Sequence, residues 1–317
     1  MLAFNESRYR SDDSGPARWA WVVADSVLFA IILCGNLLTI YVLRTSLKNS
    51  RVMSNKFVFS LAVSDTLVGL TLPYHIAFTL FPRLSSIKTT CILRFVLVLL
   101  ACCASILNVT AIAVDRYMAI VHPFKYETFM TKRVVRRMVL VACIHALLFS
   151  TVPAYWNTWS QAEVCELGQV LPRYYMTAVL MPAFLVVWAA MIAIYARIWQ
   201  EAVLQAEKLR RTNICQQCRP SFQVVMLVVG CFTVCWLPFL GVACAQAAGY
   251  RDHISSTTYK AVLFLALSSS AFNPIIYAWK NSEFKQAFKK IFRCKTKDHE
   301  LNIIQDKEST QGQQVNV

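Results

Sequence analysis

Charged side chains are scarce in this chain of 317 residues. Asp, Glu, Lys and Arg together make up 15% of it, whereas apolar and aromatic types make up 57%. The charge is crowded into short segments between long apolar stretches, which is typical of a membrane protein with several spans. The net charge is +15, but the basic residues do not form a soluble basic domain, so a nucleic-acid partner is not expected.

Seven apolar stretches indicate membrane-spanning helices, each of which needs about 20 apolar residues. They cover residues 19–43, 57–81, 89–121, 138–152, 172–199, 222–248 and 257–279, and the fourth is the shortest. We therefore predict an all-α membrane protein with a seven-helix domain over residues 18–281. Residues 1–17 form a mostly polar tail without a cleavage signal, so we expect the tail to be translocated without a signal peptide.

Lys and Arg residues are unevenly divided between the two sides of the predicted bundle. They are numerous after the first, third, fifth and seventh apolar stretches and sparse in the alternate segments. The positive-inside rule then places the amino terminus outside the cell and the carboxyl terminus in the cytoplasm. We expect a multi-pass plasma-membrane protein whose basic inner face contacts anionic membrane lipid.

The segment after the seventh stretch has an amphipathic pattern. Phe284, Phe288 and Ile291 recur at helical spacing, with lysines and arginines on the opposite face. This pattern predicts an eighth helix over residues 282–294 on the membrane surface, with Ser282 as its N-cap. Cys294 is then a candidate palmitoylation site, and residues 295–317 form a predicted disordered cytoplasmic tail.

Most of the twelve cysteines lie within apolar stretches, where a thiol behaves as a small hydrophobe. Cys91 and Cys165 lie on the predicted outer side, so we expect them to form a disulfide there. Cys215 and Cys218 form a C-x-x-C motif without a second pair, so a zinc site is not expected. Asn5 begins an Asn-Glu-Ser glycosylation sequon in the outer tail.

Ionisable groups inside spanning helices are costly, and this makes them candidates for functional sites. Asp65 stands in the middle of the second stretch, so it must be paired, protonated or bound to a cation. The polar residues expected near it are Ser105, Ser269, Ser270, Asn273 and Asn36. A second candidate is the charged Asp115-Arg116 pair at the cytoplasmic end of the third stretch.

Motifs in five of the seven stretches make residues 18–294 resemble a rhodopsin-like (class A) G-protein-coupled receptor. They are Gly35-Asn36, Leu61-Ala62-Val63-Ser64-Asp65, Cys91 with Asp115-Arg116-Tyr117, Phe232-Thr233-Val234-Cys235-Trp236-Leu237-Pro238 and Asn273-Pro274-Ile275-Ile276-Tyr277. A transporter is the distant alternative, but no internal repeat is visible. A retinal pump needs a Schiff-base lysine, which is absent between Val262 and Tyr277.

The resemblance implies roles for individual residues. It assigns G-protein coupling and activation to Asp115, Arg116, Tyr117, Phe124, Tyr195, Trp236, Pro238, Asn273, Pro274 and Tyr277. It also implies an allosteric sodium ion, the one cofactor expected, at Asp65, Ser105, Ser269 and Asn273; the alternative is a polar cluster without an ion. The implied partners are a heterotrimeric G protein, arrestin, receptor kinases and a small extracellular ligand. No enzymatic activity and no catalytic residue are expected.

The chain departs from the family pattern at three places. Gln216, Gln217, Cys218 and Arg219 stand where many members have an acid that restrains the Arg116 position, so we expect raised basal activity. Pro182 lies thirteen residues before Tyr195, and Val187 takes the place of the usual proline, which predicts a straighter or differently kinked fifth helix. His145 or a neighbour replaces the usual tryptophan of the fourth helix.

The ligand is the least constrained part of the sequence interpretation. Amine receptors carry an Asp seven residues after the outer cysteine, where this chain has Val98. The chain looks closest to adenosine receptors, with melanocortin- and cannabinoid-like features, yet Ala243 and Leu267 replace the residues that hold the nucleoside. We expect a lipid or small anionic metabolite, favoured over an amine or a peptide, in a pocket lined by Tyr74, His75, Arg94, Val98, Cys102, Phe239, Ala243, Tyr259 and Leu263.

Two questions stay open at this level. Arg94 is either a ligand contact or a salt-bridge partner of Glu163 or Glu166 in the loop before the fifth helix. The whole protein is either a ligand-activated receptor, which we favour, or a constitutively active or accessory seven-helix protein without its own ligand. The absence of an acid near Cys218 is the reason to retain the constitutively active or accessory protein as an alternative.

Overall fold

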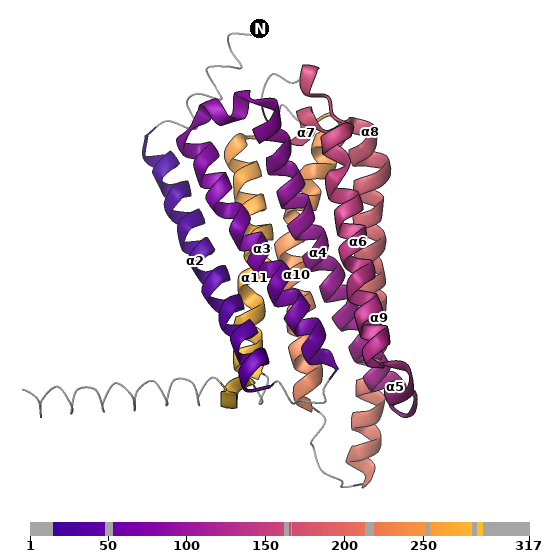
Figure 1. Ribbon diagram of the computed structural model, residues 1–317. Helices are drawn as coiled ribbons and strands as arrows, with labels where there is room; N and C mark the ends of the chain where they lie inside the picture. The colour runs from indigo at the N-terminus through magenta and orange to yellow at the C-terminus, as the bar shows by residue number, and fades with distance from the viewer. Residues whose placement is uncertain are drawn as a thin grey trace, which may run out of the picture.

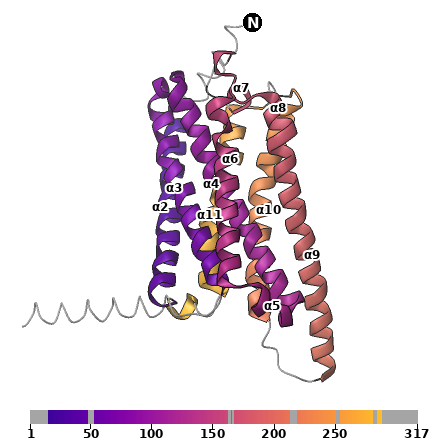
Figure 2. The ribbon, with the colours of Figure 1, turned by 45° about the vertical axis from the view of Figure 1, so that its right-hand side comes forward.

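The computed structural model describes residues 15–47, 53–161, 165, 167–212, 219–250, 254–280 and 284–287, and these contain helices and no strand. The elements in chain order are α2 (Pro16–Thr45), α3 (Ser54–Leu80), η1 (Pro82–Ser86), α4 (Lys88–Val121), α5 (Pro123–Phe129), α6 (Lys132–Tyr155), η2 (Trp159–Gln161), α7 (Leu167–Val170), α8 (Arg173–Tyr175), η3 (Met176–Leu180), α9 (Met181–Thr212), α10 (Arg219–Ala247) and α11 (Ser256–Lys280). The long helices lie side by side as a bundle (Figures 1 and 2).

The predicted seven-helix bundle is confirmed, because seven helices of the described chain are long and apolar enough to cross a membrane. The fourth, α6, begins earlier than the apolar stretch predicted, at Lys132. The Thr131 hydroxyl accepts a hydrogen bond from the Val134 N–H at 3.4 Å and so caps the helix. This cap extends the helix through the basic residues that precede the apolar core.

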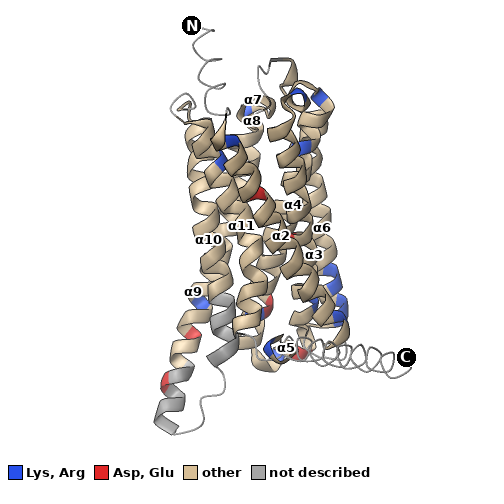
Figure 3. Ribbon diagram, turned by 90° about the vertical axis from the view of Figure 1, so that its left-hand side faces the viewer, with Lys and Arg blue, Asp and Glu red and all other residues tan. Residues whose placement is uncertain are grey.

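The surface of the bundle has the polarity of a membrane protein. Large apolar side chains such as Leu148, Val186 and Ile275 are exposed on its sides, where lipid chains would cover them. Lys and Arg gather toward the two ends, and the middle of the bundle is nearly free of them (Figure 3). The length and apolar composition of the seven helices and the polarity of the bundle surface both support a protein that crosses the membrane seven times.

Two glycines allow close approach of helices. A Cβ atom on Gly35 of α2 would lie 3.0 Å from Pro274 Cγ of α11, and one on Gly69 of α3 would lie 2.9 Å from Ile32 Cγ2 of α2. Small residues at such crossings let backbones pack closely, which drives helix association in lipid. Gly35 and Gly69 thus bring α2, α3 and α11 together around the polar residues of the interior.

The fifth spanning helix begins with an irregular turn. Residues Met176–Leu180 form a π-helical turn, in which the Met181 N–H donates to the Met176 carbonyl, five residues back. Pro182 follows directly and has no N–H to contribute to the helix. The sequence predicted a straighter or differently kinked helix, and the structure has a widened turn before Pro182, which changes the direction of the side chains that precede it.

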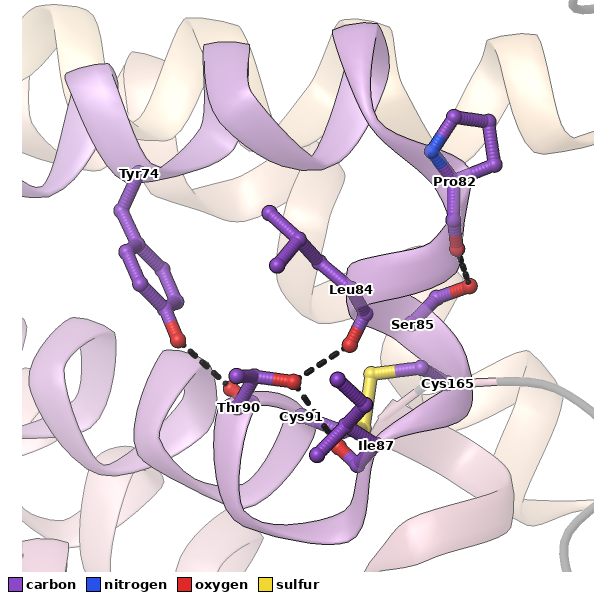
Figure 4. The surroundings of a disulfide bond; sticks show 8 residues. All are labelled: Tyr74, Pro82, Leu84, Ser85, Ile87, Thr90, Cys91 and Cys165. Atoms are coloured by element: carbon purple, nitrogen blue, oxygen red, sulfur yellow. Dashed lines mark hydrogen bonds between the residues drawn. A yellow bond between two sulfur atoms is a disulfide. The ribbon is translucent and has the colours of Figure 1, made fainter.

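The predicted disulfide is confirmed between Cys91 at the start of α4 and Cys165, with a Cα–Cα distance of 5.8 Å. A hydrogen-bond network surrounds it (Figure 4): Tyr74 Oη donates to the Thr90 carbonyl at 2.9 Å, and Thr90 Oγ1 donates to the carbonyls of Leu84 and Ile87. We call this end of the bundle the disulfide end and the other end, where Asp115 lies, the Asp115 end.

Several predicted features lie outside the described residues: the sequon at Asn5, the C-x-x-C pair Cys215 and Cys218, the cap Ser282, the palmitoylation candidate Cys294 and the tail 295–317. The predicted eighth helix is described only over 284–287, which are helical. There Phe284 is fully buried and its ring lies 5.7 Å from that of Tyr277, between centroids. The domain boundaries themselves stay predictions.

Candidate functional site

At the Asp115 end, one carboxylate collects three donors. Asp115 of α4 is fully buried, and it accepts hydrogen bonds from Ser54 Oγ of α3 at 2.5 Å and from Tyr126 Oη of α5 at 2.8 Å. It also forms an ion pair with Arg116, with 3.1 Å between Arg116 Nη2 and Asp115 Oδ2. Hydrogen bonds to an ionised acceptor are the strong ones, so these contacts fix Asp115 and hold Arg116 beside it.

Ser54 and Tyr126 were missed by sequence reasoning. Ser54 is the first residue of α3, and Tyr126 lies within the short helix α5; neither belongs to a motif that points to Asp115. Burial and the Asp115 charge raise the pKa of the Tyr126 hydroxyl to about 12, so this hydroxyl keeps its proton and remains a donor at physiological pH. The structure thus adds two donors to the charged motif.

The remaining predicted activation residues at this end divide into buried and exposed ones. Tyr195 of α9 and Tyr277 of α11 are buried, and their hydroxyls have no hydrogen-bond partner in the described part of the chain. The Tyr117 ring packs edge-on to that of His122, with centroids 5.6 Å apart. Phe124 on α5 is 98% exposed, so it is available to a protein partner at this end.

The middle of the bundle holds a polar cluster around Asp65 of α3. The carboxylate is fully buried and accepts from Ser105 Oγ of α4 at 2.8 Å, from Ser270 Oγ of α11 at 2.8 Å and from Asn273 Nδ2 at 2.7 Å. Asn36 Nδ2 of α2 donates to the Ser270 carbonyl at 3.1 Å. Four helices therefore meet at this cluster.

Ser269 is placed differently from the sequence interpretation, which put it among the cation ligands. Its hydroxyl donates to the Ala266 carbonyl at 2.7 Å and accepts from Trp236 Nε1 of α10 at 3.1 Å. Ser270, its neighbour, makes the contact with Asp65. The two serines differ in their contacts because successive residues of a helix point about 100° apart.

Aromatic rings connect this cluster to the disulfide end. The Trp236 ring stacks on Phe232 at 5.6 Å and meets Phe184 at 5.8 Å and Phe239 at 6.0 Å, all between centroids. Phe239 in turn contacts Tyr259 of α11 at 6.0 Å. Pro238 lies inside α10 next to this group. Displacement of any of these rings would disturb the hydrogen bond between Trp236 and Ser269, because close-packed interiors transmit strain.

A cavity of about 70 Å³ lies beside these rings. Seven of the nine predicted ligand residues line it: His75, Arg94, Val98, Cys102, Phe239, Tyr259 and Leu263. Tyr74 instead bonds the Thr90 carbonyl, and Ala243 is buried in the core around the disulfide; neither lines the cavity. Trp236 lines it as well, and so do six residues that sequence reasoning missed: Phe95, Leu99, Leu167, Met176, Leu180 and Met181.

Arg94 is the charged residue among the described residues that line the cavity. Its guanidinium lies 5.0 Å from the centroid of the Phe78 ring, a cation–π contact. The alternative salt-bridge partners Glu163 and Glu166 lie outside the described residues. Asp25 of α2 is one acid near both Arg94 and Lys260.

The seven-helix fold, the disulfide and the two buried acids together define a class A receptor, and comparison with known families agrees. Residues 35–277 match the family described as 7 transmembrane receptor (rhodopsin family). The chain belongs to this family. It is therefore a G-protein-coupled receptor, a multi-pass plasma-membrane protein and not an enzyme, as the sequence motifs predicted.

Similar curated proteins are receptors for amines by name. The histamine H2 receptor of Canis lupus familiaris is 30% identical, over 90% of this chain and 83% of its own length. The D(1B) dopamine receptor of Rattus norvegicus is 28% identical, over 88% of this chain and 71% of its own length. The human histamine H2 receptor is 29% identical, over 89% of this chain and 82% of its own length. These relatives give no support to the expected lipid ligand, and they do not test the resemblance to adenosine receptors.

Proposed function

We propose that this receptor carries a small extracellular signal from the cavity at the disulfide end to a heterotrimeric G protein at the Asp115 end. The observation that supports it most is the continuous path between the two ends. The cavity wall includes Trp236, which donates a hydrogen bond to Ser269. The neighbouring Ser270 donates a hydrogen bond to Asp65. A ligand that moves Trp236 can therefore shift the equilibrium of the bundle as a whole.

The orientation belongs to this proposal. A disulfide forms and persists in an oxidising compartment, which favours an extracellular disulfide end. The uneven distribution of Lys and Arg favours the same assignment. The amino-terminal tail is then outside, and Phe124 and the Arg116 motif face the cytoplasm, where the G protein, and by family resemblance arrestin and receptor kinases, would bind.

An allosteric sodium ion at Asp65 is part of the proposed inactive state. Asp65 and Ser105 supply oxygen atoms of the kind that a hard cation prefers, and Ser270 replaces Ser269 as the third oxygen. The hydroxyls now donate to the carboxylate, but each also has lone pairs to offer a cation. The residues present therefore fit the ion, which would stabilise the carboxylate in the middle of the bundle.

Two ligand classes have support from different observations. The relatives are named for histamine and dopamine, which favours an amine. The residues favour an anion, because Val98 stands where amine receptors carry an Asp and the cavity wall holds Arg94. A charged amine needs a counter-charge when it is desolvated, so we favour the anion. A receptor that signals without a ligand remains the alternative, because residues 216–219, at the start of the sixth spanning helix, include no acid to restrain Arg116.

The test of the proposed function is Arg116→Ala, measured as G-protein dissociation in cells with matched surface expression. We expect the substitution to abolish signalling while export stays near that of the parent, because the lost contacts matter mainly in the active state. Arg133→Ala on α6 removes a charge at the same end and serves as the matched control. Equal signals from the Arg116 variant and the parent would contradict the proposal.

A further inference from the structure

Four basic residues stand in the first two turns of α6, at the Asp115 end of the bundle. They are Lys132, Arg133, Arg136 and Arg137, and the first turn contains no acid. All four side chains are exposed, and Figure 3 shows Lys and Arg gathered at this end of the helix. The helix dipole opposes cations at the amino-terminal end of a helix, so an anion bound there would stabilise it.

Two of these four residues converge with a lysine of a neighbouring helix. Lys132 and Arg136 both act electrostatically on Lys56, which lies in the first turn of α3. Within the described ranges, none of the three forms an ion pair with an acid. We call Lys56, Lys132 and Arg136 the basic cluster. The positive-inside rule accounts for basic residues at this end, but it does not require three of them to meet across two helices.

An exposed apolar surface continues from the basic cluster toward the middle of the bundle. On α6, Leu140, Ile144 and Leu148 follow at intervals of four residues and are 57%, 45% and 62% exposed, and residues at this spacing form a continuous ridge. On α3, Val63 and Leu67 are exposed as well. Positive charge at the membrane surface and apolar ridges beyond it together match a lipid that has an anionic headgroup.

We propose that the basic cluster binds the headgroup of an anionic lipid that carries several phosphate groups, such as a phosphorylated inositol lipid. Three cations match such a headgroup better than they match the single net charge of phosphatidylserine, and the Arg136 guanidinium can bond two phosphate oxygens at once. The acyl chains then lie along the exposed ridges of α6 and α3. Basic sites between spanning helices on the cytoplasmic side suit such lipids. This inference rests on the proposed function, which places the Asp115 end in the cytoplasm.

The experiment measures lipid binding to the purified full-length receptor in detergent by native mass spectrometry, which resolves each bound lipid. The probes are dioleoyl phosphatidylinositol bisphosphate, dioleoyl phosphatidylserine and inositol trisphosphate. The second probe keeps the chains and carries one net negative charge, whereas the third keeps the phosphorylated headgroup without chains. We expect the bisphosphate lipid to bind at least about tenfold more tightly than either of the others, because both its charge and its chains contact the receptor.

Two double variants of α6 separate a defined site from general positive charge. One combines Lys132→Gln with Arg136→Gln, and the other combines Arg133→Gln with Arg137→Gln. Each removes two exposed charges four residues apart, but Arg133 and Arg137 each point about 100° away from the preceding residue of the cluster. The first variant should weaken binding of the bisphosphate lipid at least about tenfold, and the second less than about threefold. Both should melt at the temperature of the parent.

Lys56→Gln tests the contribution of α3 to the site. It removes one of the three charges, so binding of the bisphosphate lipid should weaken severalfold. Lys125→Gln, at an exposed site of α5 at the same end, is the control and should leave binding near that of the parent. Equal effects of the two lysine variants would remove Lys56 from the site and overturn the basic cluster as we define it.

Three other results overturn the proposal: equal effects of the two α6 double variants, equal binding of the bisphosphate lipid and phosphatidylserine, or binding of inositol trisphosphate as tight as that of the lipid. None of them bears on G-protein coupling, because binding is measured on the isolated receptor. Failure of the proposed function would show separately, as a cellular signal that Arg116→Ala leaves unchanged.

Discussion

Removal of the Tyr126 hydroxyl should raise the basal activity of this receptor. In the structure the hydroxyl donates at 2.8 Å to the buried carboxylate of Asp115, which pairs with Arg116. A hydrogen bond to a charged group is worth about 1.5–3 kcal/mol, and we take the lower end because Tyr126 is only partly buried. About 1.4 kcal/mol is a tenfold change in an equilibrium, so an active fraction of about 1% would rise to about 10%.

The assay is G-protein dissociation without added ligand, in cells sorted for equal surface expression. Tyr126→Phe removes the hydroxyl and keeps the ring. The control is Tyr41→Phe, which makes the same change at an exposed position of α2 near the Asp115 end. In an Asp115→Asn background the Tyr126 substitution should have little further effect, because the interaction that it removes is already weakened. A basal signal no higher than that of Tyr41→Phe would refute the view that Tyr126 restrains Arg116 through Asp115.

Further predictions concern the disulfide, the cation, pH and helix packing. Cys91→Ser and Cys165→Ser should each reduce export, and the double variant should be no worse, because both remove one bond; additive losses in a surface-expression assay would argue against the pairing. Sodium should lower basal activity, and Ser270→Ala should weaken that response more than Ser269→Ala, since Ser270 contacts Asp65; equal responses in a sodium titration would exclude Ser270 as a ligand. The pKa of the Tyr126 hydroxyl is raised to about 12, so its hydrogen bond to Asp115 is present below about pH 10 and is lost only as the pH rises through the raised value. A change in basal signalling between about pH 6 and pH 9 must therefore come from the titration of another group. Gly69→Val should lower the melting temperature of the purified receptor because its side chain would collide with Ile32, whereas Gly230→Val, at a position with open space around it, should have a smaller effect.

The class of protein could be predicted from the sequence because membranes impose simple rules. A spanning helix must be apolar over its length, so seven apolar stretches predicted seven helices, each with its centre in the right place. The start of α6 was missed because a side-chain cap at Thr131, rather than apolar composition, decides where that helix begins. For the fifth spanning helix the sequence predicted only a straighter or differently kinked course, and the π-helical turn that precedes α9 depends on packing.

The candidate ligand site was predicted in part. Residues on α3, α4, α10 and α11 that face the interior follow helical periodicity, and seven of them do line the cavity. Leu167, Met176 and Leu180 could not be placed in the same way. Their directions depend on the disulfide at Cys165 and on the widened turn, neither of which has a repeating pattern.

What the sequence alone determined is the class, the spans and the charged motifs, because composition and local spacing carry that information directly. Only the tertiary structure decided which groups meet. Ser54 and Tyr126 reach Asp115 from two other elements, and Ser270 rather than Ser269 reaches Asp65. Such choices depend on how each helix is rotated about its axis and how close its neighbours lie, and a rotation by one residue, about 100°, exchanges one set of contacts for another.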